Sequence, residues 1–263
     1  MKKLVIFTNE YPYGKSETFF KEELKILSGS FEVTLCPATT YGQPRGIPKG
    51  VHVDLSYGTF LKLGRPISML FSCIDPIVWK GLITHFKNLT SSSAIRRVMA
   101  VTYFANKTFE WIKYKYGNET QDIIFYSYWM DYAALGIAFA AAKTKRITGI
   151  SRAHGYDLYE ERYKPPFWPY RCFLLNQLKA VFTISENGKA YLEERYGENA
   201  KKVVISRLGT KSHVVRAKAS EENHLHLVSC SSLIPLKRVE LLMQGVLGFA
   251  KKHPKMIIKW THM

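Results

Sequence analysis

Three residues that can bind ligands or exchange protons closely follow a short apolar run at positions 147 to 150: Arg152, His154 and Asp157. Such a run is typical of a buried strand, and in an open parallel sheet the carboxyl ends of the strands border the ligand-binding crevice. An imidazole there can exchange a proton or a hydrogen bond near neutral pH. We therefore predict that His154 is the central functional residue, with a hydrogen-bonded structural histidine as the alternative.

A second group of candidate residues follows an apolar run at positions 3 to 8. Gly14-Lys-Ser16 resembles the end of a P-loop, but that motif requires glycine at position 9, where this chain has Asn9. We predict instead that Ser16 caps a helix and that Glu17 lies in its first turn, where a carboxylate favours the helix dipole. Gly14 and Glu17 are therefore candidate site residues, and for Glu17 a purely structural role at the helix start is the alternative.

Polar residues also follow two later apolar runs. Ser185 and Glu186 open a predicted helix directly after the run at positions 180 to 184. Gly209 lies in a turn after the run at positions 203 to 206. Because the carboxyl ends of parallel strands share one edge of a sheet, we expect Ser185, Glu186 and Gly209 on the same edge as His154.

Lys237 and Arg238 form a basic pair at the start of a predicted helix that runs to about Ala250. An ammonium group and a planar guanidinium both suit phosphate oxygens. Cations are unfavourable at the positive end of a helix dipole, so a bound anion would compensate them. The alternative is a basic pair that is simply solvated at the surface.

Strands and helices alternate along the chain, which predicts an α/β fold with a Rossmann-like parallel sheet covered by helices on both faces. The predicted strands are 3–8, 31–36, 122–128, 147–152, 180–184 and 203–206, and the predicted helices start near 16, 94, 132 and 185. A linker at 211–223 precedes a second strand, helix and strand. We therefore predict a domain at 1–219 and an incomplete second Rossmann-like domain at 220–263.

The segment Arg152-Ala-His154-Gly-Tyr-Asp157 resembles one in retaining glycosyltransferases of family 4, two-domain GT-B enzymes that use nucleotide sugars and often build bacterial surface polysaccharides. The first loop, the Ser185-Glu186 helix start, the Leu-Gly209 turn and the Pro-x-Lys237 turn resemble the same family in the same order. The resemblance implies a catalytic His154 beside the donor sugar. It also implies an acceptor-side cleft formed by Gly14, Glu17, Arg152, Asp157, Ser185 and Glu186. A donor diphosphate site is implied as well, formed by Lys237, Arg238 and Gly209.

The implied reaction moves a sugar, of hexosyl type, from a nucleotide-diphosphate donor to a glycan or lipid-linked acceptor with retention at the anomeric carbon. The sequence contains no Asp-x-Asp triplet, so we expect neither a metal ion nor another cofactor. Lys237, Arg238 and helix N-termini would instead balance the charge of the leaving diphosphate. Many relatives have an arginine where this chain has Ser232, which makes Arg238 a candidate substitute.

The net charge of +17 is concentrated in two segments, 60–116 with nine basic and two acidic residues and 164–219 with eleven and four. Basic surfaces of this size attract phosphate-bearing partners. Residues 60–83 also mix aromatic and aliphatic side chains with basic ones. We therefore expect peripheral binding to the cytoplasmic, inner face of an anionic membrane. The alternative is that these apolar side chains belong to the buried core and that the basic side chains surround it at the surface. Nucleic-acid binding is disfavoured, because the chain shows neither a single-strand pattern of aromatic and basic residues nor a zinc or helix-turn-helix motif.

The chain ends at Met263, soon after the second domain begins, and the pair of glutamates that family 4 enzymes carry further along the donor domain is not among these residues. We therefore expect a fragment or a naturally truncated protein that transfers no sugar by itself. A truncated, noncatalytic relative is the alternative function. We also expect residues 220–263 to be poorly ordered, because strands of a partial sheet expose their apolar faces.

Overall fold

The computed structural model describes residues 1–62, 76–209 and 218–263. The chain forms two compact units, 1–210 and 211–263, which are described separately. The predicted boundary after residue 219 therefore lies a few residues beyond the division between these units, and the roles assigned to the two domains stay predictions. The parts of the predicted membrane segment and linker at 63–75 and 211–217 lie outside the described residues.

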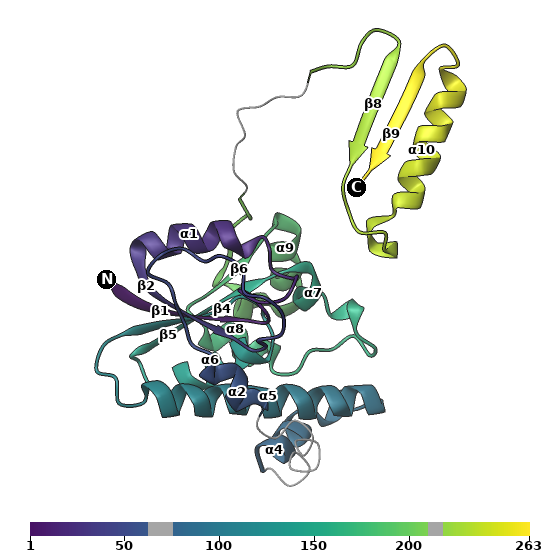
Figure 1. The fold of residues 1–263 in the computed structure, drawn as a ribbon. Helices are drawn as coiled ribbons and strands as arrows, with labels where there is room; N and C mark the ends of the chain where they lie inside the picture. The colour runs from purple at the N-terminus through teal and green to yellow at the C-terminus, as the bar shows by residue number, and fades with distance from the viewer. Residues whose placement is uncertain (63–75, 210–217) are drawn as a thin grey trace. The chain divides into compact units, whose positions relative to one another are not determined.

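A seven-stranded parallel sheet forms the centre of the first unit, in the order β3-β2-β1-β4-β5-β6-β7 (Figure 1). The strands are β1 (Lys2–Thr8), β2 (Phe31–Pro37), β3 (His52–Val53), β4 (Ile123–Ser127), β5 (Ile147–Ala153), β6 (Ala180–Thr183) and β7 (Val203–Ile205). Every neighbouring pair is parallel. The predicted α/β fold class is confirmed, and β3 is an additional strand within a segment that lacked a strand signal.

Helices cover both faces of this sheet, with α1 on one face and α2, α5 and α6 on the other (Figure 1). The helices are α1 (Phe20–Ser30), α2 (Ser56–Lys62), α4 (Pro76–Thr84), α5 (Ser92–Tyr116), α6 (Tyr132–Ala141), α7 (Gly155–Leu158), α8 (Arg171–Gln177) and α9 (Glu186–Tyr196), with 3-10 turns η1 (Phe86–Asn88), η2 (Glu160–Arg162) and η3 (Gly197–Ala200). No described helix is both long enough and apolar enough to cross a membrane.

The alternation of side chains along β1 explains why the sheet needs two helical layers. Val5 and Phe7 belong to the cluster on the side of α5 and α6, whereas Leu4 and Ile6 belong to the cluster that contains Leu24 of α1. Successive strand residues point to opposite faces, so a strand that is apolar throughout must be buried on both. The central strands are therefore held from both sides, which gives their carboxyl ends a rigid support.

The first helix starts later than predicted, at Phe20. The backbone at Glu17 has φ 56°, a left-handed conformation that cannot continue a right-handed helix. The prediction that Ser16 caps the helix is wrong, because the Ser16 hydroxyl donates a hydrogen bond to the Glu10 carboxylate at 2.7 Å instead. Glu17 consequently precedes the helix and does not lie in its first turn.

The second unit consists of β8 (His224–Ser229), η4 (Pro235–Lys237), α10 (Val239–Lys252) and β9 (Ile257–His262). β8 and β9 pair in parallel, as the predicted strand, helix and strand require. No described side chain between 218 and 263 is buried. Large apolar side chains of this unit are instead exposed, among them Leu247, Val228 and Ile257.

Candidate functional site

The loops that follow the strands bring the predicted residues of the first unit to one edge of the sheet. His154 follows β5 directly, Ser185 follows β6, and the loop containing Gly14 and Glu17 follows β1. All three strands are parallel members of the same sheet, so these loops share its carboxyl edge. The edge is thus assembled from segments up to about 170 positions apart in the chain.

His154 is buried at this edge, with 5% of its surface exposed. Its ring lies 4.5 Å from the Trp129 ring, 5.1 Å from Tyr128 and 5.4 Å from Phe19, measured between centroids. Neither ring nitrogen has a hydrogen-bond partner within the described protein. A buried polar group without a partner is costly, so the two unpartnered nitrogens single out His154 as a candidate for binding a polar ligand.

Burial, with a smaller contribution from the nearby positive charge of Arg152, lowers the pKa of His154 to about 3. The imidazole is therefore neutral near pH 7, with one nitrogen carrying a proton and the other able to accept one. A neutral ring can donate and accept hydrogen bonds, but it is a weak base because its surroundings disfavour the charged form. This site suits hydrogen bonding to a polar ligand better than proton abstraction.

Asp157 holds the turn after β5 in place. Its two carboxylate oxygens accept hydrogen bonds from the backbone N–H groups of His154 and Met130, each at 2.6 Å. Burial raises the pKa of Asp157 to about 6, against the lowering effect of these two hydrogen bonds. The Arg171 guanidinium bridges the same loops by donating to the carbonyl oxygens of Asp157 and Met130. Asp157 thus positions His154, and its carboxylate is buried.

Arg152 is also buried, and all three nitrogens of its guanidinium donate hydrogen bonds within the protein. It donates to the Tyr126 hydroxyl at 2.9 Å, to the Ser206 carbonyl at 2.6 Å and to the Glu23 carboxylate at 3.0 Å. These bonds connect β5 to β4, to the residue after β7 and to helix α1. The arrangement gives Arg152 an internal structural role beside the candidate site.

Glu17 receives more hydrogen bonds than any other candidate residue described above. Its carboxylate accepts from the backbone N–H groups of Asn9, Glu10 and Tyr11 at 2.9, 2.8 and 2.6 Å, and from the Trp129 indole at 2.5 Å. Only 2% of the residue is exposed. Since Trp129 packs against His154, Glu17 links the loop after β1 to the surroundings of the histidine ring.

The loop after β1 folds back on itself at Gly14, and this turn requires a glycine. Its φ is 62°, and a Cβ atom there would lie 2.2 Å from the Glu10 carboxylate oxygen that binds Ser16. Any side chain would therefore disturb the turn. Gly14 therefore has a conformational role, because its left-handed φ and the nearby Glu10 side chain both require a residue without a Cβ atom.

The residues after β6 and β7 are more exposed. The Ser185 hydroxyl accepts a hydrogen bond from the Gly188 N–H at 3.1 Å and so caps α9, as the predicted helix start requires. Glu186 forms an ion pair with Arg207 at 2.5 Å, in which both side chains are about two thirds or more exposed. Gly209 is exposed and has ample space for a Cβ atom.

Lys237 and Arg238 belong to the second unit, whereas Gly209 belongs to the first. Lys237 ends the 3-10 turn η4, and Arg238 precedes α10 with a left-handed φ of 49°. Both side chains are exposed. The basic pair therefore stands at a helix N-terminus as predicted, while its binding to a diphosphate stays a prediction.

Sequence reasoning missed the aromatic surroundings of His154, formed by Phe19, Tyr128 and Trp129. A usable signal was present, because Tyr128 and Trp129 directly follow the apolar residues of β4. Sequence alone could not predict the hydrogen bond from the Trp129 indole to Glu17, since 112 positions separate the two residues. Within the described ranges, no group of three or more His, Cys, Asp or Glu residues could hold a metal ion.

Solved structures of similar fold were found for the whole chain. TarM has a TM-score of 0.58 with 9% identity, and the match covers 100% of this chain and 72% of TarM. The lipopolysaccharide outer core galactosyltransferase WaaB has a TM-score of 0.57 with 13% identity, covering 100% of this chain and 68% of WaaB. An Escherichia coli structure described as trehalose-6-phosphate with UDP-2-fluoro glucose has a TM-score of 0.57 with 11% identity, covering 99% and 64%.

The first unit has the Rossmann-like fold of GT-B glycosyltransferases. Identities this low establish the fold alone. The chain spans 65% of the length of OtsA, another similar structure. No protein-family profile and no curated protein sequence matches this chain.

Proposed function

We propose that this chain is part of a retaining glycosyltransferase of family 4 type, which moves a hexosyl group from a nucleotide-diphosphate sugar to a glycan or lipid-linked acceptor in bacterial surface-polysaccharide synthesis. The GT-B fold supports the reaction class. The observation that carries the proposal is His154, a neutral, buried imidazole with two unpartnered nitrogens at the carboxyl edge of the sheet. That edge is where ligands bind to open parallel sheets.

His154 hydrogen-bonds the donor sugar in this proposal and does not act as the general base. A group whose pKa is about 3 is a poor acceptor for a hydroxyl proton at pH 7. During transfer, the bond from the anomeric carbon to the leaving phosphate oxygen breaks while the bond to the acceptor oxygen forms on the same face. The leaving phosphate takes the proton released by the acceptor hydroxyl, so atoms and charge balance without a protein base.

Two buried carboxylates position His154 in this scheme. Asp157 fixes the backbone on both sides of the site through His154 and Met130, and Glu17 fixes Trp129 against the imidazole. Both carboxylates are occupied by N–H donors, so we assign them to positioning the site. Gly14, Arg152 and Ser185 likewise support the acceptor side, whereas Glu186, exposed and paired with the similarly exposed Arg207, contacts the acceptor.

Lys237 and Arg238 bind the donor diphosphate in the proposal, and no metal ion or cofactor takes part. An ammonium and a guanidinium can stabilise the negative charge that develops on the leaving group. Both side chains are exposed and precede α10, whose N-terminal N–H groups favour an anion. Gly209, the third residue assigned to the diphosphate, has open space around its backbone.

A transfer assay tests the function. Residues 1–263, and a chimera that continues after residue 263 into a donor domain of the same fold, are supplied with UDP-, GDP-, ADP- and dTDP-sugars and lipid-linked acceptors. We expect transfer by the chimera only, because positioning both substrates supplies several kcal/mol of the barrier reduction. His154→Ala should reduce kcat at least about a hundredfold, and His52→Ala, at an exposed histidine, should not.

Three results would overturn parts of this proposal. Undiminished transfer by folded His154→Ala chimera would remove His154 from the site. Absence of transfer with every donor, together with intact folding and nucleotide-sugar binding, would favour the noncatalytic relative. Transfer by residues 1–263 alone would refute the need for a larger donor domain.

Membrane association at the cytoplasmic face is a separate part of the proposal, and α4 with the following turn supports it. Ile83 and Phe86 are 73% and 77% exposed, and Trp79 is 54% exposed. Lys80 and Lys87 lie among them, and the described residues 76 to 109 contain no Asp or Glu. Apolar side chains flanked by cations suit the headgroup region of an anionic bilayer, where each cation contributes about 1 kcal/mol.

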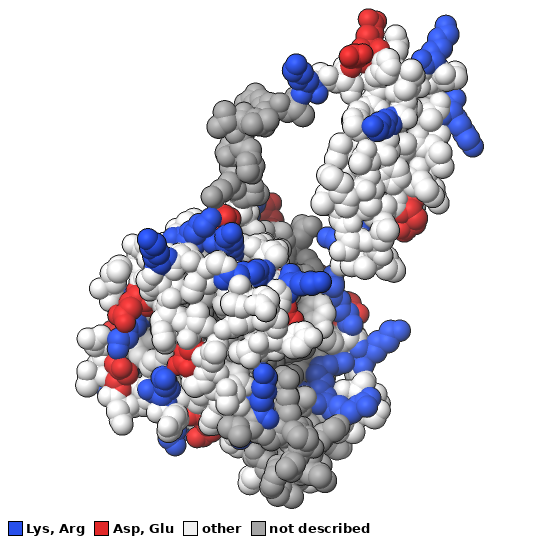
Figure 2. Space-filling model, viewed as in Figure 1, with Lys and Arg blue, Asp and Glu red and all other residues white. Residues whose placement is uncertain are grey.

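The basic side chains are otherwise spread over several parts of the face shown in Figure 2.

Co-sedimentation with vesicles of anionic or neutral lipid at low and high salt tests the membrane surface. Ile83→Asp/Phe86→Asp should abolish binding to anionic vesicles, whereas the matched pair Ile26→Asp/Tyr41→Asp, at equally exposed positions elsewhere, should preserve it. Equal loss in both variants, equal binding to neutral vesicles, or stronger binding to DNA or RNA would contradict the assignment.

A further inference from the structure

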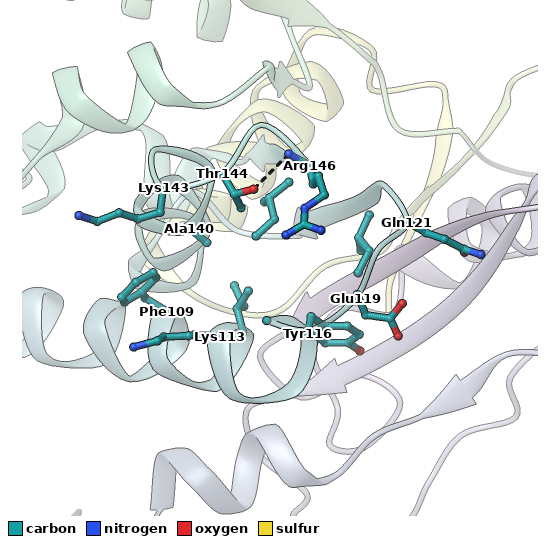
Figure 3. Close-up of a pocket in the computed structure, with 13 residues that line it drawn as sticks. Phe109, Lys113, Tyr116, Glu119, Gln121, Ala140, Lys143, Thr144 and Arg146 are labelled. Atoms are coloured by element: carbon teal, nitrogen blue, oxygen red, sulfur yellow. Dashed lines mark hydrogen bonds between the residues drawn. The ribbon is translucent and has the colours of Figure 1, made fainter.

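A cavity of about 440 Å³ opens at the amino edge of the sheet, the edge opposite to His154. Its lining includes Ile123 and Ile147, the first residues of β4 and β5, and residues from the ends of α5 and α6 (Figure 3). Its volume is within the range of about 300–1,000 Å³ that is typical of small-molecule sites. The glycosyltransferase proposal makes no use of this cavity.

The floor of the cavity is apolar and its rim is basic. Phe109, Ile112 and Ala140 join the two strand residues in an apolar lining. Lys113 comes from α5, and Lys143 and Arg146 come from the loop between α6 and β5 (Figure 3). Within the part of the chain that the structure describes, none of these three cations forms an ion pair.

The rim remains positive after its local negative charges are counted. The cavity lies at the C-termini of α5 and α6, which together carry about one unit of negative charge, roughly half from each helix dipole. Glu119 also lines the cavity, but it is bound to Lys3 at 3.0 Å. The three cations are exposed, and together they exceed the negative charge of the helix ends, so the rim favours an anion.

We propose that this cavity binds a single-chain amphiphile with an anionic headgroup, with the chain on the apolar floor and the headgroup among Lys113, Lys143 and Arg146. A second cavity of about 490 Å³ shares Phe109 and Lys143 with the first, which gives an elongated chain room to continue. The site is separate from His154 and the proposed acceptor-side residues of the first unit, because it occupies the opposite edge of the sheet. The inference therefore stands independently of the glycosyltransferase proposal.

Calorimetric titration of the 263-residue chain with dodecanoate, dodecyl phosphate and dodecyltrimethylammonium, each below its micelle concentration, tests the inference. We expect one saturable site for an anionic amphiphile and none for the cationic one. The two anionic probes distinguish a carboxylate from a phosphate headgroup. Hexanoate should bind more weakly than dodecanoate, because it buries less apolar surface.

The variant Lys113→Gln/Lys143→Gln/Arg146→Gln should weaken binding about tenfold, which is about 1.4 kcal/mol, since exposed ion pairs are individually weak. The matched variant Lys21→Gln/Lys251→Gln/Lys252→Gln removes three exposed cations on α1 and α10 and should bind as the unmodified chain does. Hydrogen exchange should slow at residues 112–123 and 140–147 upon binding. Equal affinity for the cationic probe, equal weakening in both triple variants, or protection confined to other segments would overturn the inference.

Discussion

The carboxyl edge of the first unit and the helix start of the second unit hold their candidate residues in opposite ways. Glu17 and Asp157 are buried, and their carboxylates accept four and two hydrogen bonds respectively. Lys237 and Arg238 are exposed in a unit with no buried side chain between 218 and 263. Residues of the first kind define a shape before a ligand arrives, whereas residues of the second kind supply only charge.

Hydrogen exchange should reveal the largest difference between the units. Amides of β1 and β4, in the core of the first unit, should exchange only through global opening, with a free energy on the order of 5–15 kcal/mol. Amides of α10 should exchange with an opening free energy near zero, because all its side chains are at least partly exposed. Helix α5 is the matched control, since it has nine buried residues and should be protected. If the amides of α10 were protected as strongly as those of α5, the two units would not differ in stability as expected.

Substitution of Glu17 should have the largest effect on stability. Glu17→Ala leaves four N–H donors without their acceptor, so we expect the free energy of unfolding to fall by about 3–5 kcal/mol. Urea unfolding followed by tryptophan fluorescence measures this loss. Glu32→Ala removes an exposed carboxylate from β2 and should change stability by less than about 0.5 kcal/mol. Similar losses in the two variants would show that the hydrogen bonds of Glu17 do not hold the loop.

His154 should make the protein less stable in acid. Its folded pKa of about 3 is below the ordinary value of 6.5, so the unfolded chain binds a proton first as pH falls. The contribution of this group to stability is complete above pH 6.5 and declines below it by up to about 1.4 kcal/mol per pH unit. Between pH 6.5 and 4.5 the difference in unfolding free energy between the unmodified chain and His154→Gln should shift by about 2 kcal/mol.

The pH measurement has an internal control. All other titrating groups are shared, so their effects cancel in that difference. His52→Gln, at an exposed histidine, controls for the loss of a histidine as such. A His154→Gln curve parallel to that of the unmodified chain would mean that His154 is protonated in the folded protein.

The smallest effect is expected at Glu186. Its ion pair with Arg207 is exposed to solvent on both sides, so Glu186→Gln should lower the unfolding free energy by less than about 0.5 kcal/mol. Arg207→Gln should have the same small effect, and 1 M salt should abolish both differences. If urea unfolding showed a loss of unfolding free energy above about 2 kcal/mol, Glu186 would contribute to stability as the buried carboxylates do.

Local sequence patterns determined the fold class and the position of His154. Apolar strand runs alternating with helical stripes specify a parallel sheet covered on both faces, and both features are present. A polar residue directly after such a run must lie at the carboxyl edge. The position of His154 after β5 therefore followed from the residues at 147–153 alone.

Only the tertiary structure decided what the carboxylates do. The pattern at Ser16 and Glu17 satisfied the local rules for a helix start, yet the helix begins at Phe20. The competing arrangement depends on Trp129, whose indole donates to Glu17 from another strand end, and on the left-handed backbone at Glu17. Capping rules describe contacts within a few positions, whereas a buried carboxylate takes whichever donors the fold brings to it, because leaving donors and acceptor unpaired would cost more than losing one helical turn.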